Sequence, residues 1–285
     1  MIQLQLETIG GICNAACHFC LLQDRKYYAN QGVPTGTMSM DLYRKIIDEA
    51  VGIPEISRLT LTGLSETLLD NQLEERIAYA RQKQASSAAY ASIFSYKPWP
   101  IDIYTNGLAL RPDRFDSLKA AGLTGLSVSL NAVRPEQHTA IMGIRAYEHI
   151  CRNIDYAIIT GGVHVEVKAV VNGDAFTTKD AEQFNSRWHP YAVCVHEGNW
   201  AGDNRTLRAF DPKEPCHRAI GQLYVTWEGR VGMCCFDPLA KANFGDLRTQ
   251  SIKEVYNAQR YADFRQDHAE GRADAHAVCA KCTRI

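Results

Sequence analysis

Three cysteines near the N-terminus, Cys13, Cys17 and Cys20, have a spacing that suits iron–sulfur chemistry. They follow a β-rich run in the pattern C-x3-C-x2-C, and the aromatic Phe19 stands directly before the last of them. Three thiolates from one short loop can bind three irons of a 4Fe–4S cluster and leave the fourth iron open to another ligand. Zinc is the alternative, but it needs a fourth Cys or His, and His18 is poorly placed to turn toward the same ion. The spacing favours a cluster.

A second group of cysteines lies in the last 70 residues. Its members are Cys216, Cys234, Cys235, Cys279 and Cys282. The runs Leu223–Trp227 and Arg230–Cys234, joined by Glu228-Gly229, predict a β-hairpin. If the hairpin brings Cys216 near Cys234 and the final C-x2-C loop docks against them, four thiolates surround one metal centre. A zinc ribbon fits this spacing as well as a cluster does.

The composition favours a globular protein with a small-molecule or peptide substrate. Hydrophobic residues make up 46% of the 285 residues, and 31 basic against 32 acidic side chains give a net charge of −1. This balance provides no field of one sign for nucleic acid or a membrane surface. The chain shows no signal peptide and no apolar stretch of roughly 18 residues, so we expect it in the cytoplasm. Ten cysteines there point to metal binding or catalysis rather than disulfides.

Short β-rich runs alternate with helical stretches in the first two-thirds of the chain. The strand candidates are Gln3–Thr8, Arg58–Thr62, Pro100–Thr105, Gly125–Leu130, Val163–Val171 and Ala192–Val195. Between them, Met40–Val51 and Asp113–Ala121 have the periodicity of amphipathic helices. Repeated βα units predict a parallel sheet, which gathers functional residues at the carboxyl ends of its strands.

The pattern changes at about Asp211, where the hairpin, a helical run Ser251–His268 and the cysteine-bearing tail follow. We therefore expect two domains, an α/β domain over residues 1–210 and a small α+β domain over residues 211–285.

The N-terminal cysteines and Phe19 resemble the cluster motif of the radical S-adenosylmethionine (SAM) superfamily. After the second strand, Gly63, Ser65 and Glu66 stand in a stretch similar to the glycine-rich SAM-binding motif of that family. Ser65 and Thr67 replace a glycine and a proline of the family pattern, so Gly63 and Glu66 carry the match. The resemblance implies that Glu66 accepts a hydrogen bond from the ammonium group of SAM.

Polar residues at the ends of the third and fourth strands fit the same cofactor. They are Thr105, Asn106, Ser127, Ser129 and Asn131, of which the last three share one face of their strand. The family resemblance implies that these groups bind the ribose hydroxyls and the carboxylate of SAM. Arg145 resembles a basic residue that some relatives direct at the same carboxylate.

The C-terminal region resembles the twitch domain, a shortened relative of the SPASM domain. The shared features include Gly229-x4-Cys234, the stretches Phe244–Asp246 and Ser251–Tyr256, and the closing cysteine pair. The resemblance implies one auxiliary 4Fe–4S cluster, bound by Cys216, Cys234, Cys279 and Cys282. The adjacent Cys235 can exchange with Cys234 or face the substrate as a catalytic residue.

The resemblance implies a partial (β/α)6 TIM-type barrel with a small C-terminal α+β auxiliary-cluster domain. It also implies reductive cleavage of SAM to a 5′-deoxyadenosyl radical, with electrons from a flavodoxin- or ferredoxin-type reductant. We expect hydrogen abstraction from a small carbohydrate-, aminocyclitol- or nucleoside-like substrate, followed by oxidation. Epimerisation with Cys235 as hydrogen donor, modification of a peptide or protein side chain, and a non-catalytic zinc or iron–sulfur module remain alternatives. Candidates for substrate contacts after the sixth strand are His196, Glu197, Asn199 and Trp200.

Overall fold

The computed structural model describes residues 1–23, 35–87, 98–173, 175–196 and 215–282. Within them, a nine-stranded sheet has the strand order β11-β10-β9-β1-β4-β5-β6-β7-β8. Its strands are β1 (Ile2–Leu6), β4 (Ile56–Leu61), β5 (Ile101–Thr105), β6 (Gly125–Ser129), β7 (His164–Val171), β8 (Ala192–His196), β9 (Gln222–Val225), β10 (Arg230–Gly232) and β11 (Gly245–Asp246). Two short strands, β2 (Ile9–Gly10) and β3 (Gly36–Thr37), form a separate antiparallel pair.

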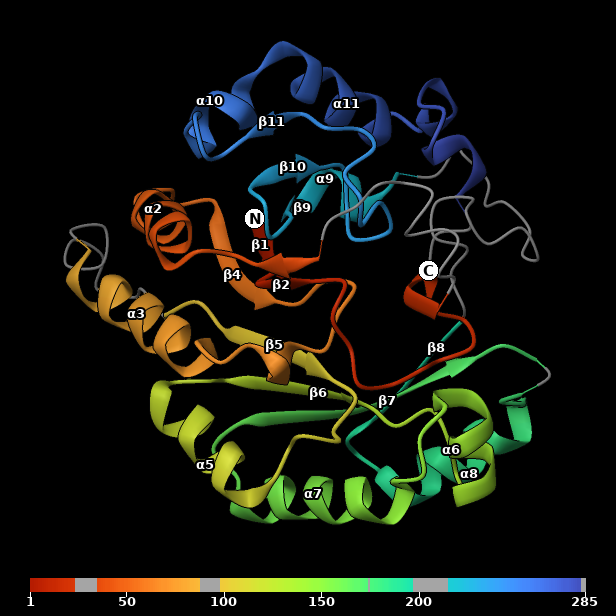
Figure 1. The fold of residues 1–285 in the computed structure, drawn as a ribbon. Coiled ribbons are helices and arrows are strands. Elements are labelled where there is room, and N and C mark those ends of the chain that lie inside the picture. Colours follow the sequence, from red (N-terminus) through yellow and green to blue (C-terminus); the bar gives the residue numbers. More distant parts are fainter. Residues whose placement is uncertain (24–34, 88–97, 174, 197–214, 283–285) are drawn as a thin grey trace.

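Six strands, from β1 through β4 to β8, run parallel in sequence order, as the repeated βα units predict. The intervening helices are α2 (Met40–Ala50), α3 (Leu73–Ser86), α5 (Pro112–Ala121), α6 (Pro135–Met142), α7 (Tyr147–Thr160) and α8 (Thr178–Trp188), and two 3-10 turns, η1 (Leu21–Gln23) and η2 (Thr67–Leu69), lie in the loops. These helices lie along the outer side of the curved sheet (Figure 1). The expected α/β fold with six parallel strands is confirmed.

The hydrophobic core fills the space between the sheet and its helices. Alternate strand residues such as Leu59, Ile103 and Val128 are fully buried there against helix residues such as Ile77 and Ile154. Each such side chain contributes about 1.5–3 kcal/mol by leaving water. The residues between them on each strand point to the other face, which is the inside of the barrel.

The C-terminal part joins the same sheet. The predicted hairpin is present, because β9 and β10 pair antiparallel with Val231 opposite Val225. Strand β9 also pairs parallel with β1, with Leu223 opposite Leu4. The sheet is thus continuous across the expected domain boundary, although the boundary itself at residues 210 and 211 lies outside the described ranges.

Helices cover this C-terminal part at the end of the molecule opposite α5 and α7 (Figure 1). They are α9 (His217–Gly221), α10 (Ile252–Asn257) and α11 (Gln259–Ala269), followed by the short turns η4 (Ala273–Ala275) and η5 (Cys279–Lys281). The expected single run Ser251–His268 is divided, because Ala258 has a non-helical backbone with φ −58° and ψ 134°. The break redirects the chain, so that Tyr261 and Phe264 of α11 pack against Phe244.

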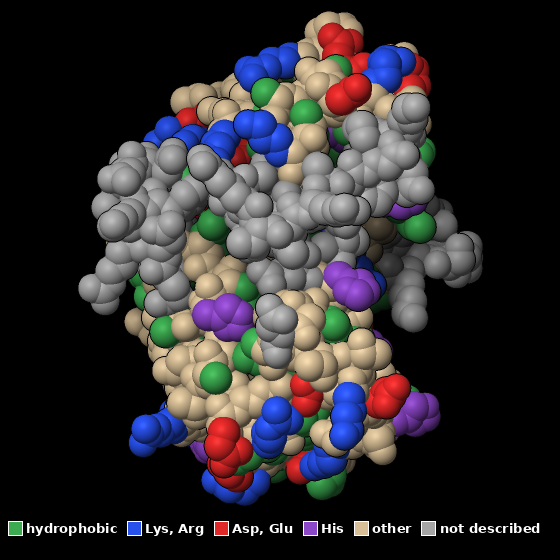
Figure 2. Space-filling view, turned by 90° about the vertical axis from the view of Figure 1, so that its right-hand side faces the viewer, with side chains coloured by type: hydrophobic (Ala, Val, Ile, Leu, Met, Phe, Trp, Pro, Cys, Tyr) green, Lys and Arg blue, Asp and Glu red, His purple; other side chains and the backbone are tan. Residues whose placement is uncertain are grey.

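Charged side chains of both signs occur together on the face drawn in Figure 2, mainly near its two ends. No helix in the described part of the chain combines the length and the apolar character needed to cross a membrane.

Candidate functional site

Backbone hydrogen bonds hold the N-terminal cysteine loop against the end of α6. The amide of Ala16 donates to the carbonyl of Met142 (2.9 Å), and the amide of His18 donates to the carbonyl of Ile141 (3.1 Å). Gly143 ends α6 with a φ of 66°, and a Cβ at this position would lie 2.7 Å from the Cβ of Ala16. Glycine therefore permits both the left-handed helix end and the close approach of the loop.

The three thiols of this loop are half-buried and not joined in disulfides. Burial raises the pKa of Cys17 to about 12 and that of Cys20 to about 11, and repulsion from the neighbouring thiolate of Cys13 adds to both. A bound metal centre reverses this effect, because coordination deprotonates a thiol. No three Cys, His, Asp or Glu side chains among the described residues lie close enough to enclose a single ion. A 4Fe–4S cluster spreads its ligands more widely, since each iron takes a different cysteine.

Glu66, Thr105 and Asn106, which the sequence assigned to one site, lie together. Glu66 is 2% exposed and its carboxylate accepts hydrogen bonds from the Thr105 hydroxyl (2.6 Å), the Asn106 amide (2.7 Å) and the Leu68 amide (3.0 Å). Burial raises the pKa of this carboxyl. The Asn106 side chain in turn donates to Cys13 Sγ at 3.8 Å. The loop after β4, the end of β5 and the cysteine loop are therefore joined through these side chains.

Gly63 and Ser65 lie in the part of this loop that contacts the segment from Glu7 to Ile9, directly after β1. The Ser65 hydroxyl donates to the carbonyl of Ile9, and the Leu64 amide donates to Glu7 Oε1 at 3.1 Å. A Cβ on Gly63 would lie 2.4 Å from Glu7 Cγ, so only glycine fits against this glutamate.

Glu7 is a residue of this site that the sequence analysis did not single out. It is 3% exposed, burial raises the pKa of its carboxyl to about 7, and its Oε2 accepts a hydrogen bond from the Trp227 amide at 3.4 Å. An acidic residue directly after the apolar alternation of Leu4 and Leu6 was the available signal, because buried carboxylates are rare without a specific role.

Ser127 and Asn131 are both bound by other parts of the protein. The Ser127 hydroxyl donates to Glu166 Oε2 at 2.8 Å. Asn131 has a φ of 53°, accepts a hydrogen bond from the Val170 amide (2.9 Å) and donates to Met142 Sδ (3.0 Å). Asn131 thus connects the ends of β6, β7 and α6 near the cysteine loop.

The remaining SAM-site candidates differ in their surroundings. Ser129 is half-buried at the end of β6, and Phe19 packs partly buried against the core with its ring edge-on to His18. Arg145 is exposed and lines a surface hollow together with Glu136 and Glu148. Of the substrate candidates after the sixth strand, His196 is the exposed end of β8, whereas Glu197, Asn199 and Trp200 lie outside the described residues.

Four of the five C-terminal cysteines lie close together, namely Cys234, Cys235, Cys279 and Cys282. Burial raises the pKa of Cys234 well above its usual value, and repulsion from Cys235, Cys279 and Cys282 adds to the rise. Cys216 stands at the start of α9, where its amide donates to the carbonyl of His268 at 3.3 Å. Two residues later in α9, Arg218 approaches Cys235 and partly offsets the rise that burial causes in the pKa of that thiol.

Gln222 connects this cysteine group to the barrel. Its side-chain oxygen accepts a hydrogen bond from the Cys235 amide (3.0 Å), and its side-chain nitrogen donates to Gln5 Oε1 of β1 (2.7 Å). Gln222 is 6% exposed, and the Tyr261 hydroxyl donates to its carbonyl. The sequence offered no sign of this residue beyond an amide at the start of a predicted strand.

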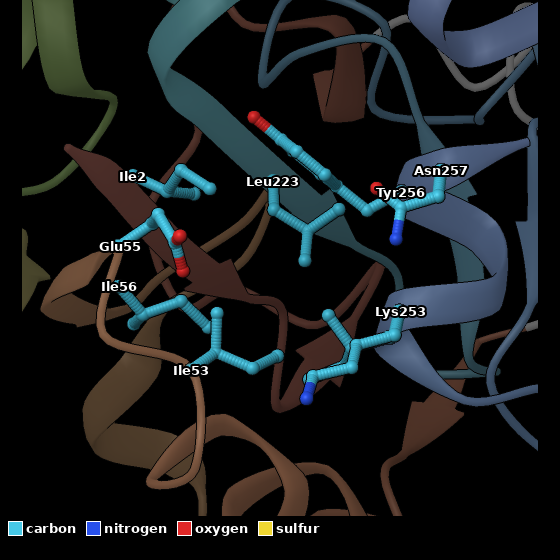
Figure 3. Close-up of a pocket in the computed structure, with 9 residues that line it drawn as sticks. Ile2, Ile53, Glu55, Ile56, Leu223, Lys253, Tyr256 and Asn257 are labelled. Atoms are coloured by element: carbon cyan, nitrogen blue, oxygen red, sulfur yellow. The ribbon is translucent and has the colours of Figure 1, made fainter. Parts of the chain in front are cut away.

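A separate hollow of about 210 Å³ lies at the opposite ends of the strands (Figure 3). Its walls come from the start of β1, the turn before β4 and helix α10, and consist of Ile2, Ile53, Glu55, Ile56, Leu223, Ile252, Lys253, Tyr256 and Asn257. Barrel enzymes place their chemistry at the carboxyl ends of strands. This hollow therefore belongs to the packing of α10 rather than to the cysteine site.

Comparison with protein families decides what this arrangement belongs to. Residues 8–171, more than half of the chain, match the family described as the radical SAM superfamily. The chain belongs to the radical SAM superfamily. Residues 216–283 match the SPASM iron–sulfur cluster-binding domain. The resemblance that the sequence motifs suggested is thus confirmed in both parts of the chain.

Individual relatives agree with this membership. A GTP 3′,8-cyclase of Paenarthrobacter nicotinovorans is 28% identical over 160 residues, which cover 56% of this chain and 40% of that protein. The chain therefore spans less than half the length of this curated relative.

Solved structures share the fold. BtrN in complex with AdoMet and 2-DOIA has a TM-score of 0.67 and 17% identity, covering 100% of this chain and 94% of that one. Native anSMEcpe with bound AdoMet and a Cp18Cys peptide has a TM-score of 0.68 and 13% identity, covering 92% and 82%. The partial TIM-type barrel with a C-terminal domain is thereby confirmed.

The two family matches also establish the cofactors, which are a 4Fe–4S cluster, an auxiliary iron–sulfur cluster and SAM. The zinc alternatives that spacing left open are set aside. The donor sets fit, because each end of the chain offers a group of cysteine thiols and none of them is joined in a disulfide.

Proposed function

We propose that this chain is a radical SAM enzyme that abstracts hydrogen from a small polar, carbohydrate-, aminocyclitol- or nucleoside-like substrate and oxidises it. When bound, the N-terminal cluster and SAM supply a radical that removes a hydrogen atom, and the auxiliary cluster supplies an acceptor for one electron. Cys13, Cys17 and Cys20 hold the first cluster, and Cys216, Cys234, Cys279 and Cys282 hold the second.

The observation that carries oxidation is the connection through Gln222. Its two hydrogen bonds link the backbone amide of Cys235, which lies beside Cys234 and Cys282, to the side chain of Gln5 on the barrel strand β1. An electron acceptor held by these thiols would therefore stand next to the barrel strand that carries Gln5. The buried side-chain amide of Gln222 also fixes the distance between the C-terminal cysteines and strand β1, because leaving this amide unpaired costs about 1–3 kcal/mol.

The residues near the cysteine loop support the cofactor part of the proposal. Asn106, held by Glu66, directs its side-chain amide toward Cys13. Ser129 and Asn131 stand at the end of β6 on the same edge of the sheet, and in this proposal they contact SAM. Arg145 is assigned the SAM carboxylate only by its resemblance to relatives.

The decisive experiment replaces Cys279 and Cys282 by Ala in the anaerobically reconstituted enzyme, with Cys151→Ala on the outer helix α7 as the matched control. The substrate is taken from a panel of polyols, aminocyclitols and nucleosides as the compound that stimulates 5′-deoxyadenosine formation. We expect the double variant to keep forming 5′-deoxyadenosine and to lose the oxidised product, because the substrate radical has no electron acceptor. Chromatography with mass spectrometry measures both compounds.

Epimerisation is the second candidate, since the backbone amide of Cys235 is held beside the barrel strand β1 by the same glutamine. In that case Cys235→Ala blocks product formation, and turnover of the wild type in deuterium oxide places deuterium on the inverted carbon without net oxidation. Turnover of a peptide, with no small polyol or nucleoside accepted, would contradict both small-molecule proposals.

A further inference from the structure

The inner face of the barrel carries a connected polar group on three neighbouring strands. On β6 and β7, Leu126, Val128, Val165 and Val167 are buried against the helices, so the residues between them point into the barrel. These inward residues include Ser127 on β6 and Glu166 and Lys168 on β7, with Tyr104 on the adjacent β5.

These four side chains form a continuous network. Lys168 Nζ lies 3.0 Å from Glu166 Oε2 and donates to the Tyr104 hydroxyl at 3.1 Å. The same ammonium lies 4.3 Å from the centre of the Tyr104 ring, within the range of a cation–π interaction. Ser127 donates to Glu166 at 2.8 Å. Partial burial raises the pKa of Glu166, but these hydrogen bonds outweigh it and leave the pKa below its usual value.

The network leaves one N–H donor of Lys168 and one carboxylate oxygen of Glu166, Oε1, available side by side for a ligand. An ammonium has three N–H donors, and two of those on Lys168 are directed at Glu166 and Tyr104. Glu166 Oε2 receives both of the bonds described, whereas Oε1 has His164 at 3.8 Å, beyond hydrogen-bond length. The side chains of Lys168 and Glu166 keep 18% and 31% of their surface exposed, so a ligand can reach both.

The charges of this wall cancel. Strands β4 to β7 carry Arg58, Asp102, Glu166 and Lys168, together with His164 at the start of β7. Arg58 pairs with Asp102 as Lys168 pairs with Glu166. A triphosphate or another polyanion requires surplus cations, and this part of the barrel provides none. A hydroxyl group, which both donates and accepts, matches the free donor and acceptor.

We propose that the Glu166–Lys168 pair binds adjacent hydroxyl groups of an uncharged polyhydroxylated ring, such as a cyclitol or an unphosphorylated sugar. This inference rests on the proposed function and narrows its substrate class. Ser127 is then a positioning residue for Glu166. Ser129, two residues further toward the carboxyl end of β6, is still proposed to contact SAM. The discrimination against phosphates follows from the paired charges rather than from the size of the site.

The test measures binding of myo-inositol and D-glucose to the reconstituted enzyme in the presence of SAM, by calorimetry or saturation-transfer NMR. Glu166→Gln and Lys168→Met each remove one partner, and we expect each to weaken polyol binding about tenfold or more. Lys83→Met is the matched control, because Lys83 pairs with Asp48 on the outer helices. SAM affinity and iron content should stay unchanged in all three variants, which shows that they are folded.

Several results would overturn the inference. The first is equal polyol affinity in the wild type and both variants, and the second is no binding of either polyol at millimolar concentration. The third is displacement of the polyol by GTP, with GTP binding that is lost in Lys168→Met but not in Glu166→Gln. The proposed function is tested separately by incubating the wild type with SAM and dithionite. If no 5′-deoxyadenosine forms, the proposed function is wrong, whatever ligand binds at Glu166 and Lys168. If SAM is cleaved normally but the two variants bind polyols as well as the wild type does, only the role of the Glu166–Lys168 pair is rejected.

Discussion

Glu66 illustrates how a single residue can serve both a ligand and the fold. The family resemblance assigns its carboxylate to the ammonium group of SAM, yet three donors from the protein already approach it. Two of these donors, from Thr105 and Asn106, belong to the end of β5. Because Asn106 also approaches Cys13, the carboxylate helps to position the cysteine loop.

Glu66→Ala should therefore destabilise the protein even without its cofactors. The change leaves the Thr105 hydroxyl and the Asn106 amide unpaired in a buried place, so we expect the free energy of unfolding to fall by about 1–3 kcal/mol. Urea unfolding of the cluster-free protein measures this, and Thr105→Val, which removes one donor and leaves the carboxylate, should cost less. If Glu66→Ala weakened SAM binding but left unfolding unchanged, its role would be confined to the ligand.

At the scale of elements, Glu7 joins three segments that meet at the end of β1. Its carboxylate accepts hydrogen bonds from Leu64, in the loop after β4, and from Trp227, in the turn between β9 and β10. The indole of Trp227 lies against Gly10 and Gly36 of the small β2–β3 pair, where any Cβ would collide with the ring. The expected SAM loop and the C-terminal hairpin thus share one buried side chain.

The raised pKa of Glu7 predicts a pH dependence of stability. With its pKa raised to about 7, Glu7 keeps its proton in the folded protein up to about pH 7, whereas the unfolded chain releases it near the ordinary glutamate pKa of 4.5. Folding is therefore favoured at low pH by up to about 3 kcal/mol, and this contribution is lost as the pH rises through about 7. Glu7→Gln cannot titrate, so its stability relative to the wild type should increase between about pH 5 and about pH 8. Parallel pH profiles of unfolding for the two proteins would show that Glu7 is not protonated in the fold.

For the whole molecule, the sheet crosses the expected division at residues 210 and 211. Strand β9 completes β1 on the side away from β4, and Leu223, Val225 and Val231 are buried in the same core as Leu4. Helix α2 reaches the C-terminal part as well, because Lys45 donates to the carbonyls of residues 247 and 250. We expect the two family segments to fold as one cooperative unit.

A fragment of residues 1–210 tests this expectation. It leaves one edge of β1 unpaired and apolar surface uncovered, so it should unfold at lower urea concentration than the full chain and bind a hydrophobic dye. Lys45→Met in the full chain removes two hydrogen bonds but keeps β9, and should cost only about 1–3 kcal/mol. A fragment with the same cooperative unfolding midpoint as the full chain would establish two independent domains.

Local features of the sequence determined the family, the cofactors and the order of the elements. Cysteine spacing within one loop is fixed by the covalent chain, and the alternation of apolar residues sets each strand whatever it later pairs with. The six parallel strands, the hairpin and the carboxyl-end position of Glu66, Thr105 and Asn106 all follow from such short-range signals.

Only the tertiary structure decided which distant side chains meet. Gln222 and Gln5 are 217 residues apart in sequence, and Ser127 and Glu166 are 39 apart. Their hydrogen bonds depend on the register between strands, which sequence periodicity leaves open. This register places the Ser127 hydroxyl opposite Glu166, and it pairs Arg58 with Asp102 and Lys168 with Glu166. The pairing of β9 with β1 likewise appears only in the folded chain. The proposed substrate class rests on these pairings, because charge balance inside a barrel is a property of the assembled strands.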